Sequence, residues 1–259
     1  MVENKFCGIF VDHNSKEYSI KLLKSISNYK HPIDIHIINN FDGFDDYGEY
    51  ESIKLQVHNI DNIGYFQSIN YVLKKIEPTL FDYIFIGNND IEFRNDIISI
   101  IENKNYKNSV YCISPDIINR SGIHQNPHVL KPYSFFKKLK LDIYYSSYHL
   151  AKILSMLFRK NIQKNNKPYE YSGEIHMGNG SFYILTNHFF SQAKILDTPP
   201  FLNGEEAFLS NQIKSNGGKT IYDPDLKIYH DESVSLAKVN NRKKFNWSKK
   251  SYKQHRRFL

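Results

Sequence analysis

The sequence predicts an α/β fold built on a mostly parallel central sheet. In residues 1–114, short apolar segments of strand length alternate with segments whose apolar residues recur at helical spacing. Asn and Asp residues directly follow two of these apolar segments, at the ends of the strands where open α/β sheets bind ligands. The chain has 259 residues, 41% of them hydrophobic, and only two cysteines. It therefore has enough apolar material for one large domain without disulfides.

The first half of the chain justifies the α/β prediction element by element. The first strand is expected over 5–11, and Ser15 is a plausible start for the helix that follows, because apolar residues recur at near-helical spacing after it. The other elements expected in this half are strands over 33–38, 52–58, 82–87 and 109–114 and helices over 63–76 and 96–101.

Residues 115–172 interrupt this alternation, with four prolines and little strand pattern. We interpret them as an insertion over the ligand-binding face and not as a second domain. Within them, 139–160 is helical, aromatic and flanked by basic residues, which suits either a lid packed on the core or an amphipathic helix at a membrane interface. Beyond the insertion we expect a strand over 180–185, helices over 187–194 and 205–215, and two short strands around a proline turn within 219–230.

The positive charge is concentrated at the C-terminal end. The net charge is +7, but nine Lys and Arg and no acidic residue lie within 237–259, so the rest of the chain carries −2. A segment of this kind suits contact with phosphates, nucleic acid or anionic lipid, or is simply a solvated helix face. We expect one domain over 1–236 and a basic tail over 237–259 that serves location at an anionic membrane surface and not chemistry. The alternative is that the tail packs on the domain through Phe245 and Trp247.

No apolar stretch approaches the ~18 residues that would span a bilayer. The N-terminal residues have acidic and polar breaks where a signal peptide needs a continuous apolar region. The sequence therefore predicts a cytoplasmic protein, with a possible peripheral position at the inner face of the cell membrane.

Three groups of residues are candidates for chemistry. Asn89 and Asp90 follow an apolar strand, and a carboxylate there can hold Mg²⁺ or Mn²⁺, although turns also favour these residues. His230 ends another strand and is either structural or a metal ligand as neutral imidazole. Glu205 and Glu206 open a helix, where acids favour the helix dipole but where a general base could also stand.

A fourth candidate is the polar turn around Asn62 and Gly64, with Asn70 on the helix that follows. A helix N-terminus of this kind suits a phosphate or a sugar, and it also suits a simple helix cap.

Taken in order, these segments resemble family-two glycosyltransferases of the GT-A fold. The resemblance covers about 1–114 and 173–236, and its most specific block is 201–233, from the Glu-Glu helix to the strand that ends in His. The subgroup that it resembles includes rhamnosyl- and galactofuranosyl-type transferases of bacterial surface polysaccharides.

The resemblance implies an inverting transfer of a sugar from a nucleotide-diphosphate donor to a hydroxyl of a glycan or lipid-linked glycan. It implies a divalent cation, Mn²⁺ or Mg²⁺, held by Asp90 and His230, with Glu206 as the catalytic base and Glu205 as the second candidate. The residues implied to bind the nucleotide sugar are Asn14, Asn39, Asn62, Gly64, Asn70 and Asn89. The chain departs from the family at Asn39 and Glu206, where the family usually has Asp.

Three other readings compete. A sugar-nucleotide nucleotidyltransferase would carry a Gly-rich basic loop after the first strand, where this chain reads VDHNSKEY. A catalytically decayed glycan- or nucleotide-binding protein of the same fold would account for the departure at Asn39. A nucleic-acid-binding protein would account for the basic tail, but no recognised motif lies near its aromatic residues, so we expect no nucleic-acid partner.

Overall fold

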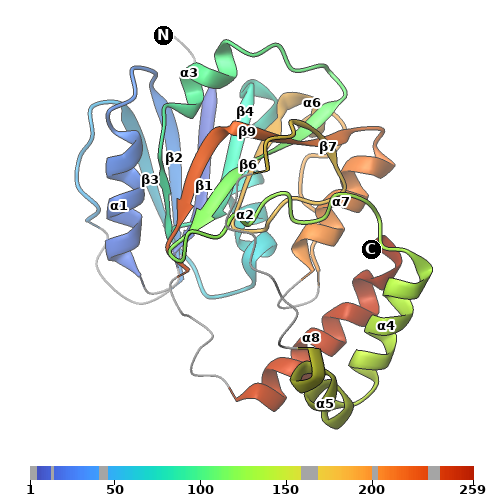
Figure 1. Cartoon of the computed structure of the whole chain (residues 1–259). Coiled ribbons are helices and arrows are strands. Elements are labelled where there is room, and N and C mark those ends of the chain that lie inside the picture. The colour runs from blue at the N-terminus through green and yellow to red at the C-terminus, as the bar shows by residue number, and fades with distance from the viewer. Residues whose placement is uncertain (1–4, 13–14, 41–45, 159–168, 200–203, 233–239) are drawn as a thin grey trace.

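The computed structural model describes residues 5–12, 15–40, 46–158, 169–199, 204–232 and 240–259. A mixed sheet of nine described strands runs through the molecule in the order β3-β2-β1-β4-β8-β6-β9-β5, with β7 paired to β9 (Figure 1). Six of these strands run in one direction, and β5, β7 and β8 run in the other. The strands are β1 (Phe6–Asp12), β2 (Ile33–Asn39), β3 (Ile53–Asn59), β4 (Tyr83–Asn88), β5 (Ile91–Phe93), β6 (Val110–Asn119), β7 (Gly173–Ile175), β8 (Phe182–Thr186) and β9 (Lys219–His230).

Helices cover both faces of the sheet, and each face has its own apolar core. On one face, Leu22 and Ile97 pack with Phe85 of the sheet, and on the other, Ile69 and Leu209 belong to a second buried cluster. The helices are α1 (Lys16–Ile26), α2 (Tyr65–Leu73), α3 (Ile97–Glu102), α4 (Phe135–Ser146), α5 (Tyr148–Phe158), α6 (Asn187–Phe190), α7 (Glu205–Ser215) and α8 (Asn241–His255), with short 3₁₀ turns at Pro78–Leu80 and Arg256–Phe258.

The predicted fold class is confirmed, and the expected elements of the first half form close to their expected bounds. Strands β5 and β7 were not predicted, because three residues are too few to show an alternating pattern. Both cysteines are buried as expected, and burial raises the pKa of Cys112 to about 12.

The prediction of two short strands within 219–230 is wrong. Residues Lys219–His230 form one strand that pairs with β6 along its length. The register shifts between Pro115 and Asp116, whose partners are Asp223 and Lys227, so Pro224 lies in an irregularity that interrupts the register without ending the strand.

The region expected as an insertion also differs in detail. Its first residues, 115 to 119, belong to β6. The single helix expected over 139–160 begins earlier and is two helices, α4 and α5, because Ser147 between them has an extended backbone (φ −145°, ψ 141°). These two helices lie beside α8, away from the sheet (Figure 1).

Candidate active site

The pairing of β5 with β9 brings the two predicted metal ligands together. Ile91 is the antiparallel partner of His230, so Asp90, one residue earlier, lies beside the imidazole. His230 Nε2 is 3.4 Å from Asp90 Oδ1, and both side chains are buried. The short strand β5, which the sequence did not reveal, therefore creates this contact.

A chain of hydrogen bonds fixes which nitrogen of His230 faces Asp90. Gln125 Nε2 donates to Glu232 Oε1 at 2.7 Å, which leaves the Gln125 amide oxygen to face His230 Nδ1 at 2.8 Å. Since an amide oxygen only accepts, Nδ1 carries the hydrogen, and Nε2 is the nitrogen that faces Asp90 and can serve as a ligand in a neutral ring. Asn119 Nδ2 donates to the other oxygen of Glu232 at 2.9 Å.

This arrangement suits a divalent cation. A neutral imidazole nitrogen and a carboxylate oxygen that face each other are two acceptors, and Mn²⁺ accepts both ligand types. No cluster of three or more His, Cys, Asp or Glu residues suited to a metal lies in the described part of the chain. Two protein ligands are nevertheless enough for a cation that also binds substrate phosphates.

The two glutamates stand at the N-terminal turn of α7. Gly204 precedes them with φ +101°, a conformation that favours glycine, and a Cβ there would lie 2.6 Å from His255 Nδ1 of α8. A Cβ at Gly180 would lie 2.7 Å from Glu206 Oε1. Small residues on both sides therefore allow the Glu206 carboxylate to approach the backbone before β8.

The charges of carboxylates from both predicted sites act on one buried phenol. The pKa of Tyr65 is raised well above its usual value, first by burial and then by the charges of Glu205, Glu206 and Asp90. The pKa of Tyr183 is raised by burial and then by Glu206 in the same way. Among the described residues, neither tyrosine hydroxyl has a hydrogen-bond partner.

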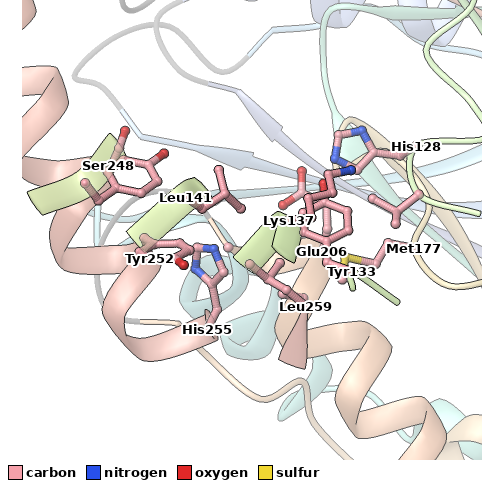
Figure 2. A pocket seen from close by; sticks show the side chains of 14 residues that line it. His128, Tyr133, Lys137, Leu141, Met177, Glu206, Ser248, Tyr252, His255 and Leu259 are labelled. Carbon is pink, nitrogen blue, oxygen red and sulfur yellow. The ribbon is translucent and has the colours of Figure 1, made fainter. Parts of the chain in front are cut away.

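Glu206 also lines a cavity of about 400 Å³ (Figure 2). Its walls come from the segment before α4, from α4, from α7 and from the C-terminal residues, and they combine aromatic with ionisable side chains. They include His128, Tyr133, Lys137, Leu141, Tyr145, Met177, Ala207, Ser248, Tyr252, His255 and Leu259.

The C-terminal segment is thus more than the location device expected from its charge. Phe245 and Tyr252 of α8 are buried, and Phe245 packs on Tyr145 with ring centroids 5.9 Å apart. His255 lines the cavity, and its pKa is lowered by burial, against an opposing effect of Glu206. Packing through Phe245 is the alternative that the sequence leaves open beside location at a membrane.

Most of the residues expected to bind the nucleotide sugar have structural partners. Asn39 Nδ2 donates to Asn59 Oδ1 at 2.7 Å, and Asn62 Oδ1 accepts from the Gly64 backbone at 3.2 Å. Asn70 holds the Leu196 backbone through two hydrogen bonds of 2.8 Å. Gly64 is the N-cap of α2 with φ +105°, and Asn14 lies outside the described residues.

Asn89 belongs to a buried polar cluster at the end of β1. Its Nδ2 donates to Ser19 Oγ at 2.9 Å, and Ser19 Oγ donates to Asp12 Oδ2 at 2.6 Å. The backbone N–H of Ser15 donates to Asp12 Oδ1 at 2.9 Å. Asp12 was not singled out in the sequence, although its position at the end of a buried strand is the same signal that identified Asp90.

Comparison with solved structures identifies similar folds. S. aureus TarS (residues 1–349) matches with a TM-score of 0.54 and 13% identity over 88% of this chain and 60% of its own. GalNAc-T7 with UDP, GalNAc and Mn²⁺ matches with a TM-score of 0.59 and 14% identity over 90% of this chain and 45% of its own. TarS 1–349 in complex with UDP-GlcNAc matches with a TM-score of 0.54 and 14% identity over 91% and 62%.

No family model and no curated protein matches the chain. It spans between 45% and 62% of the three solved chains described above, and identities of 13% to 14% establish likeness of fold. The chain therefore has the mixed α/β fold that the resemblance to GT-A glycosyltransferases implied, and it is structurally similar to TarS and GalNAc-T7.

Proposed function

We propose that this protein is an inverting glycosyltransferase that moves a sugar from a nucleotide-diphosphate donor to a hydroxyl of a glycan or lipid-linked glycan. The observation that carries the proposal is the buried contact between Asp90 and His230, whose Oδ1 and Nε2 lie 3.4 Å apart, in a fold similar to TarS and GalNAc-T7. Glu206 of α7 lines a cavity of a size that suits a sugar.

Asp90 and His230 are the residues that would hold Mn²⁺ or Mg²⁺. When bound, the cation would offset the negative charge that builds up on the departing nucleotide diphosphate. The Gln125 amide keeps the hydrogen on His230 Nδ1, so Nε2 is available as a ligand. This role for a cation is consistent with GalNAc-T7, which was solved with Mn²⁺.

Glu206 is proposed as the general base. An acceptor hydroxyl in the cavity would pass its proton to the Glu206 carboxylate while its oxygen forms a bond to the anomeric carbon. The bond from that carbon to the diphosphate oxygen breaks, and the diphosphate leaves with the electron pair. Attack from the face opposite the leaving group inverts the anomeric configuration.

The experiment that tests the proposal is a screen of nucleotide sugars for hydrolysis, with Mn²⁺, with Mg²⁺ and with EDTA. UDP-GlcNAc is the first probe, because TarS was solved with it, and dTDP-rhamnose and UDP-galactofuranose test the subgroup suggested by the sequence. We expect cation-dependent release of the nucleoside diphosphate from one donor. Binding of UDP without turnover of any donor would favour the catalytically decayed protein, and failure to bind any nucleotide would reject both.

A further inference from the structure

We infer that α4, α5 and α8 form a docking surface for an anionic lipid membrane. The helical lobe, defined here as residues 130–158 and 240–259, stands away from the sheet (Figure 1). The inference rests on two features that the fold brings together in this lobe: exposed apolar stripes and a large excess of cations.

The first stripe lies on α4. Phe135 and Phe136 are 70% and 72% exposed, and Leu139 and Ile143 are also exposed. At about 100° per residue, these four positions fall within an arc of about 100° on one side of the helix. The opposite side faces α8: Tyr145 stacks on Tyr252 with ring centroids 4.6 Å apart. The stripe is therefore the face that α4 does not use for packing.

The second stripe lies on α5. Ile153, Met156 and Leu157 are 54%, 63% and 68% exposed, whereas Ala151 is buried. The three exposed positions again fall within about 100° of the helix circumference. Single exposed apolar residues are common on protein surfaces, but two aligned sets on adjacent helices are the pattern of a contact site.

The positive charge of the lobe indicates an anionic partner. The lobe contains thirteen Lys and Arg and one acidic side chain, Asp142, which is held by Arg256 through an Nε–Oδ1 contact of 2.6 Å. The cations are Lys131, Lys137, Lys138, Lys140, Lys152, Arg242, Lys243, Lys244, Lys249, Lys250, Lys253, Arg256 and Arg257. An apolar stripe bordered by lysines on amphipathic helices matches the interface of an anionic bilayer, with acyl chains below and phosphates at the rim.

The same charge argues against a second copy of this chain as the partner. Two lobes pressed together would bring like charges into contact with one acid on each to offset them. Nucleic acid would use the cations and leave the apolar stripes in water. None of the described helices is both long and apolar enough to cross a membrane, so the lobe would lie at the interface.

Docking in this way would place the Glu206 cavity on the far side of α4 from the lipid, within about one helix diameter of the membrane. Lys137 and Leu141 of α4 and Tyr252 of α8 line that cavity from the lobe. If the proposed transfer reaction holds, which this consequence requires, the acceptor is a glycan carried on a lipid. The docking itself does not depend on catalysis, so it can be tested without a nucleotide.

The test is flotation of the full chain with vesicles of phosphatidylcholine, with and without phosphatidylglycerol. We expect binding to the anionic vesicles that falls as salt rises. The double variant Phe135→Ser/Phe136→Ser should reduce it at least about tenfold, because two exposed rings no longer enter the acyl region. The triple variant Lys140→Gln/Lys152→Gln/Lys250→Gln should reduce it by about fivefold per charge.

The matched controls lie outside the helical lobe. One is Leu80→Ser, at an apolar position that is 62% exposed, and the other is Lys24→Gln/Lys30→Gln, in which Lys24 belongs to α1 and Lys30 follows that helix. Both should bind vesicles as the unmodified chain does. The inference is overturned if the unmodified chain does not float, or if lobe and control variants lose binding equally. Two other results would also overturn it. In the first, the unmodified chain does not bind vesicles but self-associates, and Phe135→Ser/Phe136→Ser abolishes that self-association. In the second, the Lys variants weaken nucleic-acid binding and leave vesicle binding unchanged. Donor hydrolysis measured without vesicles reports separately on the transfer reaction.

Discussion

Glu205 and Glu206 are adjacent in the first turn of α7, so their side chains point about 100° apart and only one can face a given acceptor. Glu206 lines the cavity. We therefore expect Glu206→Gln, which keeps size and polarity but removes the proton acceptor, to lower turnover by about 10²–10⁴-fold with little change in nucleotide affinity. Steady-state transfer beside calorimetric titration of UDP measures both quantities.

Glu205→Gln is the matched control and should lower turnover less than Glu206→Gln does. If Glu205→Gln is the inactive variant, the catalytic role belongs to the neighbouring carboxylate. If neither variant loses turnover, the base does not come from α7.

Asp90 tests the cation site. Asp90→Asn keeps the shape of the side chain but replaces a charged ligand with a weak neutral one, so Mn²⁺ should no longer strengthen nucleotide binding. Titration of UDP with and without Mn²⁺ measures the difference directly. Full Mn²⁺ enhancement in the variant would show that Asp90 is not a ligand.

Gln125 tests the positioning of His230. Gln125→Met removes the amide oxygen 2.8 Å from Nδ1, so the imidazole should lose its fixed tautomer, and Mn²⁺-dependent nucleotide binding should weaken by about 10–100-fold. The ¹⁵N shifts of the His230 ring report the tautomer and would not move if Gln125 were only a packing residue. Gln56→Met, the same change at an exposed position of β3, is the control.

At the scale of an element, the contact between β2 and β3 includes a histidine pair, in which His36 is buried and His58 is half-buried. His36 Nδ1 lies 2.9 Å from His58 Nε2, and the pKa of His36 is lowered to about 4, first by burial and then by His58; Asp34 opposes this with a smaller effect, and Lys54 lowers the pKa slightly further. Between about pH 6.5 and about pH 4 the unfolded chain takes up a proton that the native ring does not bind. The free energy of unfolding should therefore fall as the pH falls through this window, by on the order of 2–3 kcal/mol, with no loss above it.

Urea unfolding at about pH 7 and about pH 5 checks this prediction. His36→Gln removes the titrating ring and should flatten the dependence. An unchanged pH dependence in the variant would place its origin in other groups.

Substitutions at two glycines test the contact between α7 and α8. Gly204 and Gly217 both have positive φ, but a Cβ at Gly204 would meet His255, whereas a Cβ at Gly217 would have nothing within 4 Å. Gly217→Ala should cost about 1–2 kcal/mol of backbone strain, and Gly204→Ala should cost more because the α8 ring must also move. Urea unfolding of the two variants gives the difference, and equal losses would show that α8 does not press on Gly204.

At the scale of the whole molecule, the proposed site is assembled from segments far apart in the sequence. The turn between β4 and β5 supplies Asp90, the end of β9 supplies His230, and α7 supplies Glu206. Strands β8 and β5, which run antiparallel to their neighbours in the sheet, bring these segments together. Residues of the C-terminal helix α8 line the cavity beside Glu206. The basic segment, which its charge alone would suggest lies outside the domain, therefore forms part of the cavity wall.

By itself the sequence determined the α/β class, most strands and helices, and the residue types of the proposed site. These follow from local periodicity and from polar residues at strand ends, such as Asp90 and His230, which can be read within a few positions. Only the tertiary structure decided which of these residues meet. The pairing of Ile91 with His230, the bond from Asn70 to Leu196 and the packing of Phe245 on Tyr145 join distant segments, and such contacts depend on the burial of complementary surfaces that no local pattern encodes.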